Sequence, residues 1–328
     1  MGVVGRLGLY RTGLIRQQHL ATRVISVGNL TAGGTGKTPF VILLAGEIRN
    51  RGVPPAVVVR GYKGRREGQT VVVSDGETVR LGYPEAGDEA LLLARKLPGV
   101  PVIMAADRVA GCRVAMRDLG AQVILLDDAF QHLKVARDLD ILLLDRENPL
   151  GYGYLLPRGL LREPASAIRR ADLLVMTGAG DSSMLPKASS LIRHMGAKPV
   201  LQAVFTPTVF TDSKTGHAIA GEDLRGEEVV AFSGIANPPA FERTLRSQGI
   251  HPKHHVIFPD HHPYAPSDLI EIARRMQEGG ARIALTTEKD AVRLEKIAPP
   301  FSVVTVGVTL VLTSGHAELK KSLDALFP

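Results

Sequence analysis

The amino-acid sequence predicts an α/β fold. The expected first domain, built around a phosphate loop (P-loop), has a mostly parallel sheet between two layers of helices, and a smaller second domain is of the same α/β/α kind. Short apolar runs recur along the chain, helical segments separate most of them, and the character of the sequence changes near residue 200 before the alternation resumes. The runs are continuously apolar, which is typical of strands buried on both faces of a parallel sheet.

Six β-branched and leucine-rich runs are the predicted strands of the first domain: 23–28, 55–61, 100–105, 122–128, 140–145 and 172–178. Helical segments such as residues 39–52 and 87–97 lie between them. Alternation of strand and helix indicates a doubly wound sheet. Because ligands of such sheets bind at the carboxyl ends of the strands, the polar residues that follow the strands are the candidates for a functional site.

The chain reads as strand, turn and polar loop between residues 199 and 226, and a second α/β stretch follows. A strand-like run at 301–312 and a final helix complete it. We expect the 199–210 and 301–312 strands to form a two-stranded linker between the domains. The predicted divisions are residues 1–200 for the P-loop domain, 201–226 for the linker strand and loop, 227–300 for the smaller C-terminal domain, and 301–328 for the return strand and final helix.

The composition, with 45% hydrophobic and 22% charged residues, is that of an ordinary globular protein. Cys112 is the single cysteine, so no disulfide can form within the chain, which fits a reducing compartment. No apolar run is long enough to cross a bilayer and no secretion signal is evident, so the cytoplasm is the expected location. The net charge of +7 suits an anionic partner, although an arginine-rich surface explains it equally well.

Residues 1–20 mix apolar side chains with arginines. On a helical wheel one broad arc holds Val3, Val4, Leu7, Tyr10, Leu14 and Ile15. Arg6 and Arg16 lie outside it, whereas Arg11 breaks the pattern. Such a helix could lie on a membrane surface or pack on its own domain, and the pattern alone leaves both readings open.

The stretch "VISVGNLTAGGTGKTPF" (24–40) resembles a P-loop, whose usual pattern is G-x-x-x-x-G-K-[ST], except that Thr31 stands at the opening glycine position. A predicted strand precedes it and a helix follows it, and this is the setting in which backbone N–H groups hold phosphates. Lys37 would reach the β- and γ-phosphates, and the Thr38 hydroxyl would bind Mg²⁺. The alternative is a glycine-rich turn. The candidate ATP-binding residues are Thr31, Ala32, Gly33, Gly34, Thr35, Gly36, Lys37 and Thr38.

Asp127 and Asp128 follow the apolar run of a predicted strand. An aspartate in this place orders Mg²⁺ or its water in many P-loop proteins, although a charged strand end is also common. The spacing leaves open which of the two does so.

Three further groups of polar residues are candidates. Asp88 stands before a predicted helix, where it can cap the helix or accept a proton from a hydroxyl. Asp260, His261 and His262 share one loop, and without further ligands at suitable spacing they do not indicate zinc. Arg158, Arg162 and Glu163 lie in "LLPRGLLREP", where the arginines could neutralise phosphoryl charge or form surface ion pairs.

Several separated motifs together resemble one family, the tetraacyldisaccharide 4′-kinases of lipid A biosynthesis in Gram-negative bacteria. They cover most of residues 23–293 in the family's order: "SVGNLTAGGTGKTP", "RGYKG", "GDEALLLA", "DDAFQH", "LLPRGLLREP", "FSGIANP", "FPDHH" and "TTEKDAVR". The threonine at the start of the P-loop is itself similar to the family's version.

The resemblance implies that the γ-phosphoryl group of ATP goes to the 4′-hydroxyl of a tetraacyldisaccharide 1-phosphate, giving lipid IVA, with ATP and Mg²⁺ as cofactors. It places the family's catalytic aspartate at Asp88, with His261 as its partner and Lys37 on the phosphates. It places Asp127, Asp128 and Glu163 around Mg²⁺ and the nucleotide. It therefore favours the base over the cap for Asp88, and one residue could do both.

An acylated substrate stays in the membrane. The resemblance therefore implies a peripheral protein on the cytoplasmic side of the bacterial inner membrane, with residues 1–20 as an interfacial anchor. It implies no nucleic-acid ligand and no obligate protein partner. The sequence also allows two other classes of protein. A P-loop ATPase acting as a switch would need neither Asp88 nor the His261 loop, and a nucleic-acid binder is suggested by net charge alone.

Overall fold

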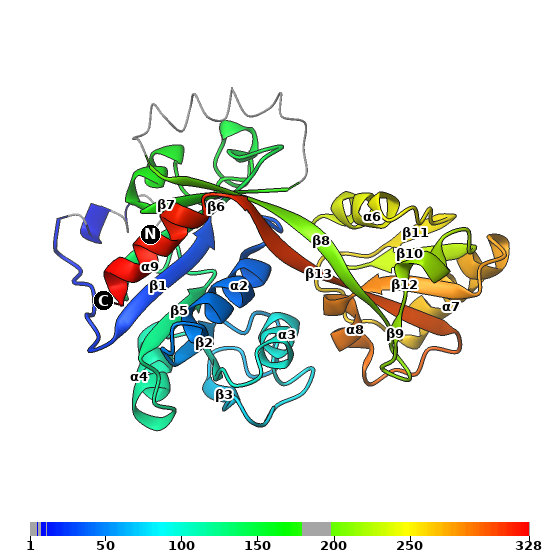
Figure 1. Cartoon of the computed structure of the whole chain (residues 1–328), viewed down its shortest axis with the longest axis horizontal. Helices are drawn as coiled ribbons and strands as arrows, with labels where there is room; N and C mark the ends of the chain where they lie inside the picture. Colours follow the sequence, from blue (N-terminus) through cyan, green and yellow to red (C-terminus); the bar gives the residue numbers. More distant parts are fainter. Residues whose placement is uncertain (1–4, 6–7, 11, 179–197, 328) are drawn as a thin grey trace.

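The computed structural model describes residues 5, 8–10, 12–178 and 198–327. Figure 1 shows two lobes side by side, joined by a pair of long strands. A single sheet runs through both lobes in the order β11-β10-β12-β13-β8-β7-β6-β1-β5-β2-β4-β3, with β9 paired to β8 alone. The predicted α/β architecture with a mostly parallel sheet is confirmed.

The sheet of the N-terminal lobe contains the six strands predicted from the sequence. They are β1 (Arg23–Asn29), β2 (Pro55–Val59), β4 (Val102–Ala105), β5 (Val123–Asp127), β6 (Leu139–Asp145) and β7 (Leu173–Thr177), and they pair in parallel. Almost every residue in them is buried, which explains their continuous apolar sequence. The edge strand β3 (Thr70–Ser74), antiparallel to β4, was not predicted.

Helices cover both faces of this sheet. α2 (Lys37–Arg49) and α3 (Asp88–Lys96) pack on one face, where Phe40 and Leu44 of α2 are fully buried. α4 (Arg108–Asp118) packs on the other face. Two short 3₁₀ helices, η1 (Gly151–Gly153) and η2 (Ala165–Arg170), lie in the segment between β6 and β7. The last helix, α9 (His316–Leu326), returns to this lobe and buries Leu319 and Leu323 in the same core as α2.

The two long strands that join the lobes are β8 (Val200–Asp212) and β13 (Ser302–Ser314), and they are antiparallel to each other. At one end β8 pairs in parallel with β7, and at the other β13 pairs in parallel with β12. Their register shifts between Gly307 and Val308 and again between Leu312 and Ser314.

The C-terminal lobe is a smaller three-layer unit. Its strands are β10 (Val229–Ser233), β11 (His254–Ile257) and β12 (Ile283–Thr287), paired in parallel, with the short β9 (Ala218–Ile219) at the linker. Its helices are η4 (Gly221–Leu224), α6 (Pro238–Ser247), α7 (Pro266–Glu278) and α8 (Glu288–Leu294). Separate apolar clusters lie against the two faces of the sheet, one around Phe241 of α6 and the other around Ile272 of α7.

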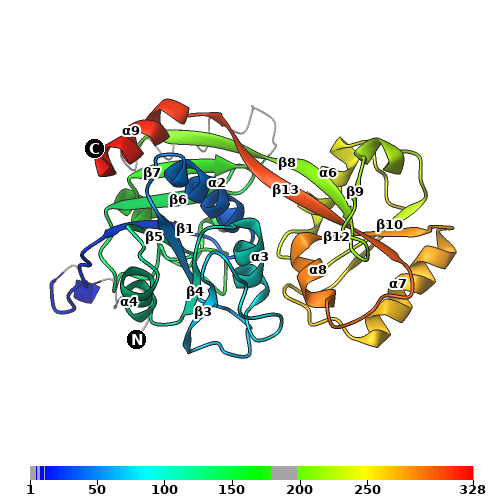
Figure 2. The same ribbon diagram turned by 60° about the horizontal axis from the view of Figure 1, so that its bottom comes forward.

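The lobes meet where α3 faces α8, and both views place these helices next to each other (Figures 1 and 2). This contact consists largely of ion pairs. The pairs are Asp88–Arg293, Glu89–Lys289, Lys96–Glu288, Arg95–Glu295 and Glu85–Lys296.

Within the part of the chain that the structure describes, no helix is long and apolar enough to cross a membrane. The predicted interfacial helix at residues 1–20 falls partly on residues 1–4, 6–7 and 11, which lie outside that part.

Candidate active site

The glycine-rich loop connects β1 to α2 and is held by hydrogen bonds from two strand ends. Asn29, the last residue of β1, donates from Nδ2 to the carbonyl oxygen of Thr31 at 2.7 Å. Thr177, the last residue of β7, donates its hydroxyl to the carbonyl oxygen of Thr35 at 2.9 Å. The loop therefore follows a fixed path ahead of the N-terminus of α2, an arrangement suited to binding phosphate.

Thr31, the residue that departs from the usual loop pattern, forms an isolated antiparallel bridge with Leu161. The backbone there is extended, a conformation that suits a β-branched residue and does not need glycine. Two later loop positions do need it, because Gly33 has φ +117° and Gly36 has φ +81°. At Gly36 a side chain is also excluded by space, since a Cβ atom would lie 2.6 Å from Cζ of Phe205 on β8.

Asp127, at the carboxyl end of β5, lies beside the first turn of α2. The Thr38 hydroxyl donates to its Oδ2 at 3.1 Å, while its buried Oδ1 has no hydrogen-bond partner among the described residues. Burial, together with the charges of Glu89 and Asp128, raises the pKa of Asp127 to about 7. A buried carboxylate with an unpaired oxygen next to a threonine hydroxyl is a suitable donor set for a hard divalent cation.

Asp128 is engaged differently from its neighbour. Its backbone has φ 51°, and its carboxylate is 2.9 Å from Nη1 of Arg162 and 3.6 Å from Nζ of Lys37. Burial opposes the charged carboxylate, but the charges of Lys37 and Arg162 outweigh it and lower the pKa of Asp128. Asp128 therefore fixes the P-loop lysine and an arginine at the same edge of the sheet.

Glu163, the third predicted metal ligand, is fully buried and pairs with Arg170 of η2 at 2.6 Å. The structure places no direct contact between it and Asp127 or Thr38. Across the described ranges, no group of three or more histidine, cysteine, aspartate or glutamate side chains is arranged to hold a metal ion. The Thr38–Asp127 pair is therefore the part of the predicted metal set that the structure brings together.

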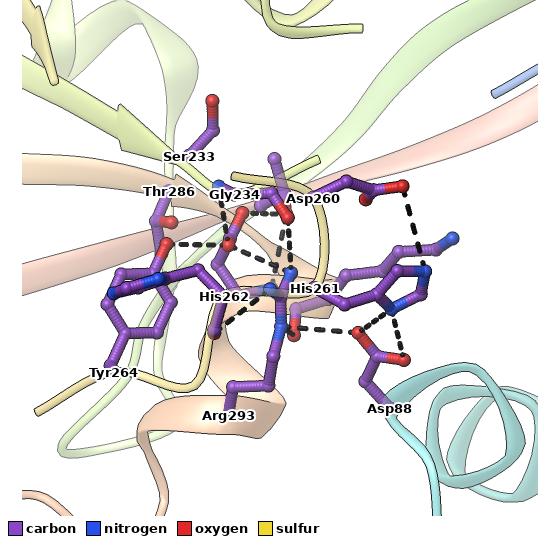
Figure 3. A network of polar contacts seen from close by, with 12 residues as sticks. Asp88, Ser233, Gly234, Asp260, His261, His262, Tyr264, Thr286 and Arg293 are labelled. Atoms are coloured by element: carbon purple, nitrogen blue, oxygen red, sulfur yellow. Dashed lines mark hydrogen bonds and ion pairs between the residues drawn. The ribbon is translucent and has the colours of Figure 1, made fainter. Parts of the chain in front are cut away.

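Asp88 is the first residue of α3 and meets His261 of the C-terminal lobe (Figure 3). Nδ1 of His261 lies 2.9 Å from Oδ2 and 3.0 Å from Oδ1 of Asp88. Oδ1 also accepts the backbone N–H of Glu89 at 2.9 Å. The N-cap position itself belongs to Gly87, so Asp88 stabilises the first turn without being the cap residue.

His261 is held in an unusual backbone conformation with φ 57°, and its N–H donates to the carbonyl oxygen of Gly234 at 2.9 Å. Its Nε2 lies 3.8 Å from Asp260, and the Tyr62 ring meets the imidazole edge-on at 5.4 Å between centroids. Burial disfavours the charged imidazole, but the hydrogen bond and charge of Asp88 outweigh this, so the pKa of His261 is raised. His262, the next residue, pairs instead with Asp268 at 2.8 Å.

The P-loop and the Asp88–His261 pair belong to one electrostatic site. Glu89, next to Asp88, has its pKa lowered by Lys289 first, and also by Lys37 and His261. Charges on the P-loop lysine and on the C-terminal histidine therefore act on the same carboxylate. A phosphate donor held by the P-loop would thus lie near a carboxylate–imidazole pair that can accept and release a proton.

Three residues of this site have no role predicted from the sequence. Arg293 lies 3.2 Å from Asp88, Lys289 pairs with Glu89 at 2.6 Å, and Arg108 donates to the carbonyl oxygen of Asp127 at 3.2 Å. Arg293 and Lys289 belong to the motif "TTEKDAVR", which marked the segment without showing what it faces. Arg158, weighed as a phosphate ligand, instead stacks on the Tyr154 ring at 3.9 Å.

Comparison with known proteins gives a consistent result. The family model for LpxK, tetraacyldisaccharide-1-P 4′-kinase, matches residues 1–327. The chain is 42% identical over 312 residues to the tetraacyldisaccharide 4′-kinase of Syntrophus aciditrophicus (strain SB), covering 92% of this chain and 83% of that protein. It is 42% identical over 328 residues to that of Anaeromyxobacter sp. (strain Fw109-5), covering 99% and 88%.

Among solved structures, the fold is similar to that of the "apo" form of LpxK from Aquifex aeolicus in complex with ATP. The TM-score is 0.77 at 33% sequence identity, and the match covers 99% of this chain and 95% of that one.

Proposed function

The chain belongs to the tetraacyldisaccharide-1-P 4′-kinase family, and we infer from this that it transfers the γ-phosphoryl group of ATP to the 4′-hydroxyl of tetraacyldisaccharide 1-phosphate. The product is lipid IVA, a lipid A precursor. The observation that carries this reading in the structure is the Asp88–His261 pair beside the P-loop. A nucleotide-dependent switch has no use for such a pair.

On the donor side, the P-loop N–H groups and the N-terminus of α2 bind the phosphates of ATP. Lys37, held by Asp128, places its charge on the β- and γ-phosphates. Phosphoryl transfer depends mainly on positioning and on stabilising charge, so this fixed frame supplies much of the catalysis.

Mg²⁺ fits the Thr38 hydroxyl and the unpaired, buried Oδ1 of Asp127. A bound Mg²⁺ would supply positive charge that offsets the negative charge of the phosphates. Glu163 and Asp128 are each already paired with an arginine, so we do not assign them as direct ligands of this ion.

On the acceptor side, the 4′-hydroxyl oxygen attacks the γ-phosphorus, the bond from phosphorus to the bridging oxygen breaks, and ADP leaves. The hydroxyl proton needs an acceptor. Asp88 is 3% exposed and its carboxylate is already engaged by His261, Arg293 and a backbone N–H. Among the described residues, the charged partner of Nε2 of His261 is Asp260, at the longer distance of 3.8 Å. We therefore assign the base to Nε2 of His261, with Asp88 holding the Nδ1–H tautomer, in place of a direct proton transfer to Asp88.

The two lobes are proposed to act as separate domains. The base comes from the C-terminal lobe, and the P-loop from the N-terminal lobe. Closure of the lobes would complete the site and exclude water, which limits ATP hydrolysis.

Because an acylated substrate stays in the membrane, we propose that the protein acts as a peripheral protein at the cytoplasmic face of the inner membrane. An exposed apolar loop near the P-loop supports this location. Tyr152 is 75% exposed and Leu156 is 51% exposed, and Tyr154 and Leu155 between them are also exposed. Leu160, which ends this loop, accepts the N–H of Ala32 in the P-loop at 2.7 Å. Aromatic and leucine side chains of this kind suit a membrane interface.

The deciding experiment incubates the protein with γ-labelled ATP and tetraacyldisaccharide 1-phosphate in detergent micelles. We expect label to appear in the lipid. An intact protein that transfers no label, but hydrolyses ATP when some protein partner is added, would instead support the switch.

A further inference from the structure

Arg293 connects the two halves of the site and is almost completely buried, with 1% of its side chain exposed. Its Nε lies 3.2 Å from Oδ2 of Asp88 in the other lobe. Within its own lobe, Nη2 lies 3.0 Å from Asp290 and donates to the carbonyl oxygen of Gly234 at 3.0 Å, and Nη1 donates to the carbonyl oxygen of His262 at 3.2 Å. Figure 3 shows the guanidinium between the histidine loop and Asp88.

Asp290 is the centre of the network behind Arg293. It is fully buried and accepts the Gly234 N–H at 2.9 Å, the Tyr264 hydroxyl at 2.7 Å and the Thr287 hydroxyl at 2.6 Å. These donors are neutral, so Arg293 supplies the positive charge that compensates the buried carboxylate.

The same network fixes His261 through the backbone. Gly234 donates its N–H to Asp290, and its carbonyl oxygen accepts both Arg293 and the N–H of His261. A Cβ atom on Gly234 would lie 3.1 Å from Cβ of His262 and 3.2 Å from Nη1 of Arg293, so the backbone approaches closely here. The elements that hold the histidine backbone are thus the ones that hold the arginine.

Asp88 consequently has two cationic or hydrogen-bonding partners from the other lobe. Nδ1 of His261 lies 2.9 Å from its carboxylate, and Nε of Arg293 forms an ion pair with it at 3.2 Å while the Nε–H also donates to the carbonyl oxygen of Lys289. Within its own lobe Arg293 already pairs with Asp290 and donates to three carbonyl oxygens, those of Gly234, His262 and Lys289. The ion pair between Arg293 and Asp88 crosses the lobe boundary and is not needed to neutralise Asp290.

We propose that Arg293 is a positioning residue that holds the Asp88 carboxylate against His261 when the lobes meet, so that its loss misaligns the catalytic pair. This inference rests on the proposed function, since it concerns the residues that would handle the acceptor proton. Misplacement of a catalytic group by about 1 Å can cost on the order of 100-fold in rate.

The test compares Arg293→Met with the double variant Arg293→Met/Asp290→Asn. The single variant leaves a buried carboxylate without its partner and could fail to fold. The double variant removes both charges and keeps the network neutral. Arg282→Met, in an exposed position of the same lobe, is the matched control. Thermal unfolding and ATP binding identify the variants that are folded.

We expect the folded double variant to lose roughly 100-fold in kcat while its KM for ATP changes little, because the P-loop is untouched. In an Asp88→Asn background the same change should cost far less, because the carboxylate that Arg293 positions is absent. A double variant with undiminished kcat would show that Arg293 serves only to neutralise Asp290. An equal loss in both backgrounds would show that it acts without Asp88.

A second measurement does not depend on catalysis. Titration of the His261 imidazole by NMR should give a raised pKa in the wild type and a pKa near the ordinary histidine value in the double variant, because Asp88 no longer stays against Nδ1. A pKa that remains raised in the double variant overturns the inference. If the wild type transfers no phosphate to the disaccharide, the proposed function fails, while this titration still decides whether Arg293 positions Asp88.

Discussion

Asp88 and His261 are 173 positions apart in the sequence and belong to different lobes, yet Nδ1 of His261 lies 2.9 Å from the Asp88 carboxylate. Neither lobe alone contains the pair. Its formation reports that the lobes are in contact, and its chemistry depends on burial supplied by both.

The pH dependence of the reaction should report the raised pKa of His261. The charged groups that face it are Asp88, Asp260, Glu89 and Arg293. As the base it must be neutral, so kcat/KM should rise with pH through a value above the ordinary histidine pKa of about 6.5. Asp88→Asn removes the charge that favours the imidazolium, so the rise should move to lower pH while the maximal rate falls by about 10²- to 10⁴-fold.

The same pair also links stability to pH. The pKa of His261 is raised in the folded state. The pair therefore stabilises the folded protein at pH values below the unfolded-state pKa of the histidine, and this stabilisation is lost as the pH rises through the folded-state pKa. Denaturant unfolding of the wild type, compared with Asp88→Asn, measures this loss. A stability difference that grows with pH across that range would contradict the assignment.

Asp127→Asn should weaken the binding of Mg²⁺ more than Asp128→Asn does. Asp127 has the unpaired oxygen beside Thr38, whereas Asp128 is occupied by Lys37 and Arg162. We expect the Mg²⁺ concentration for half-maximal activity to rise about 10- to 100-fold for Asp127→Asn. Titration of kinase activity with Mg²⁺ at saturating ATP measures it, and an equal effect of both variants would remove the distinction.

Gly36→Ala should damage both folding and nucleotide binding. The position has φ +81°, and the added Cβ atom would lie 2.6 Å from the Phe205 ring. The backbone term alone costs about 1–2 kcal/mol. Combining it with Phe205→Leu should relieve the steric part and leave the backbone part. Urea unfolding of the single and double variants separates the two, and no recovery in the double variant would rule out the steric cause.

The exposed loop that includes Tyr152 and Leu156 should contribute to membrane binding. Tyr152→Ser/Leu156→Ser should lower binding to vesicles containing anionic lipid, because both side chains are exposed and apolar. Ile270→Ser is the matched control, since Ile270 is 71% exposed on α7 of the other lobe. Vesicle co-sedimentation measures the difference, and equal binding by the two variants would assign the membrane contact to another surface.

The strands of the N-terminal lobe could be predicted because they are buried on both faces, as in β5, where all residues are buried. Edge strand β3 was not predicted, because its first residue is exposed and the next two are only partly buried, which leaves a short and mixed pattern. Strand prediction thus succeeded where burial leaves a continuous apolar signal.

The catalytic site was predictable only in part. The P-loop and the Thr38–Asp127 region have local patterns, so the sequence indicates them directly. His261 and His262 are adjacent and chemically identical, and their roles are separated by the pairing of His261 with Asp88 and of His262 with Asp268. Arg293 looks like an ordinary helical arginine until α8 is placed against α3. These roles arise from contacts between distant segments, which no local periodicity encodes.

The continuous sheet has a mechanical consequence. β8 and β13 pass from one lobe to the other as a two-stranded ribbon with register shifts along its length, and Figure 2 shows that this ribbon spans the waist of the molecule. Because β8 and β13 pair along most of their length, rotation of one lobe against the other would change the twist of this ribbon. The Phe205 ring on β8 contacts Gly36. A change in the twist of the β8–β13 ribbon would therefore act directly on the phosphate loop, without involving any helix.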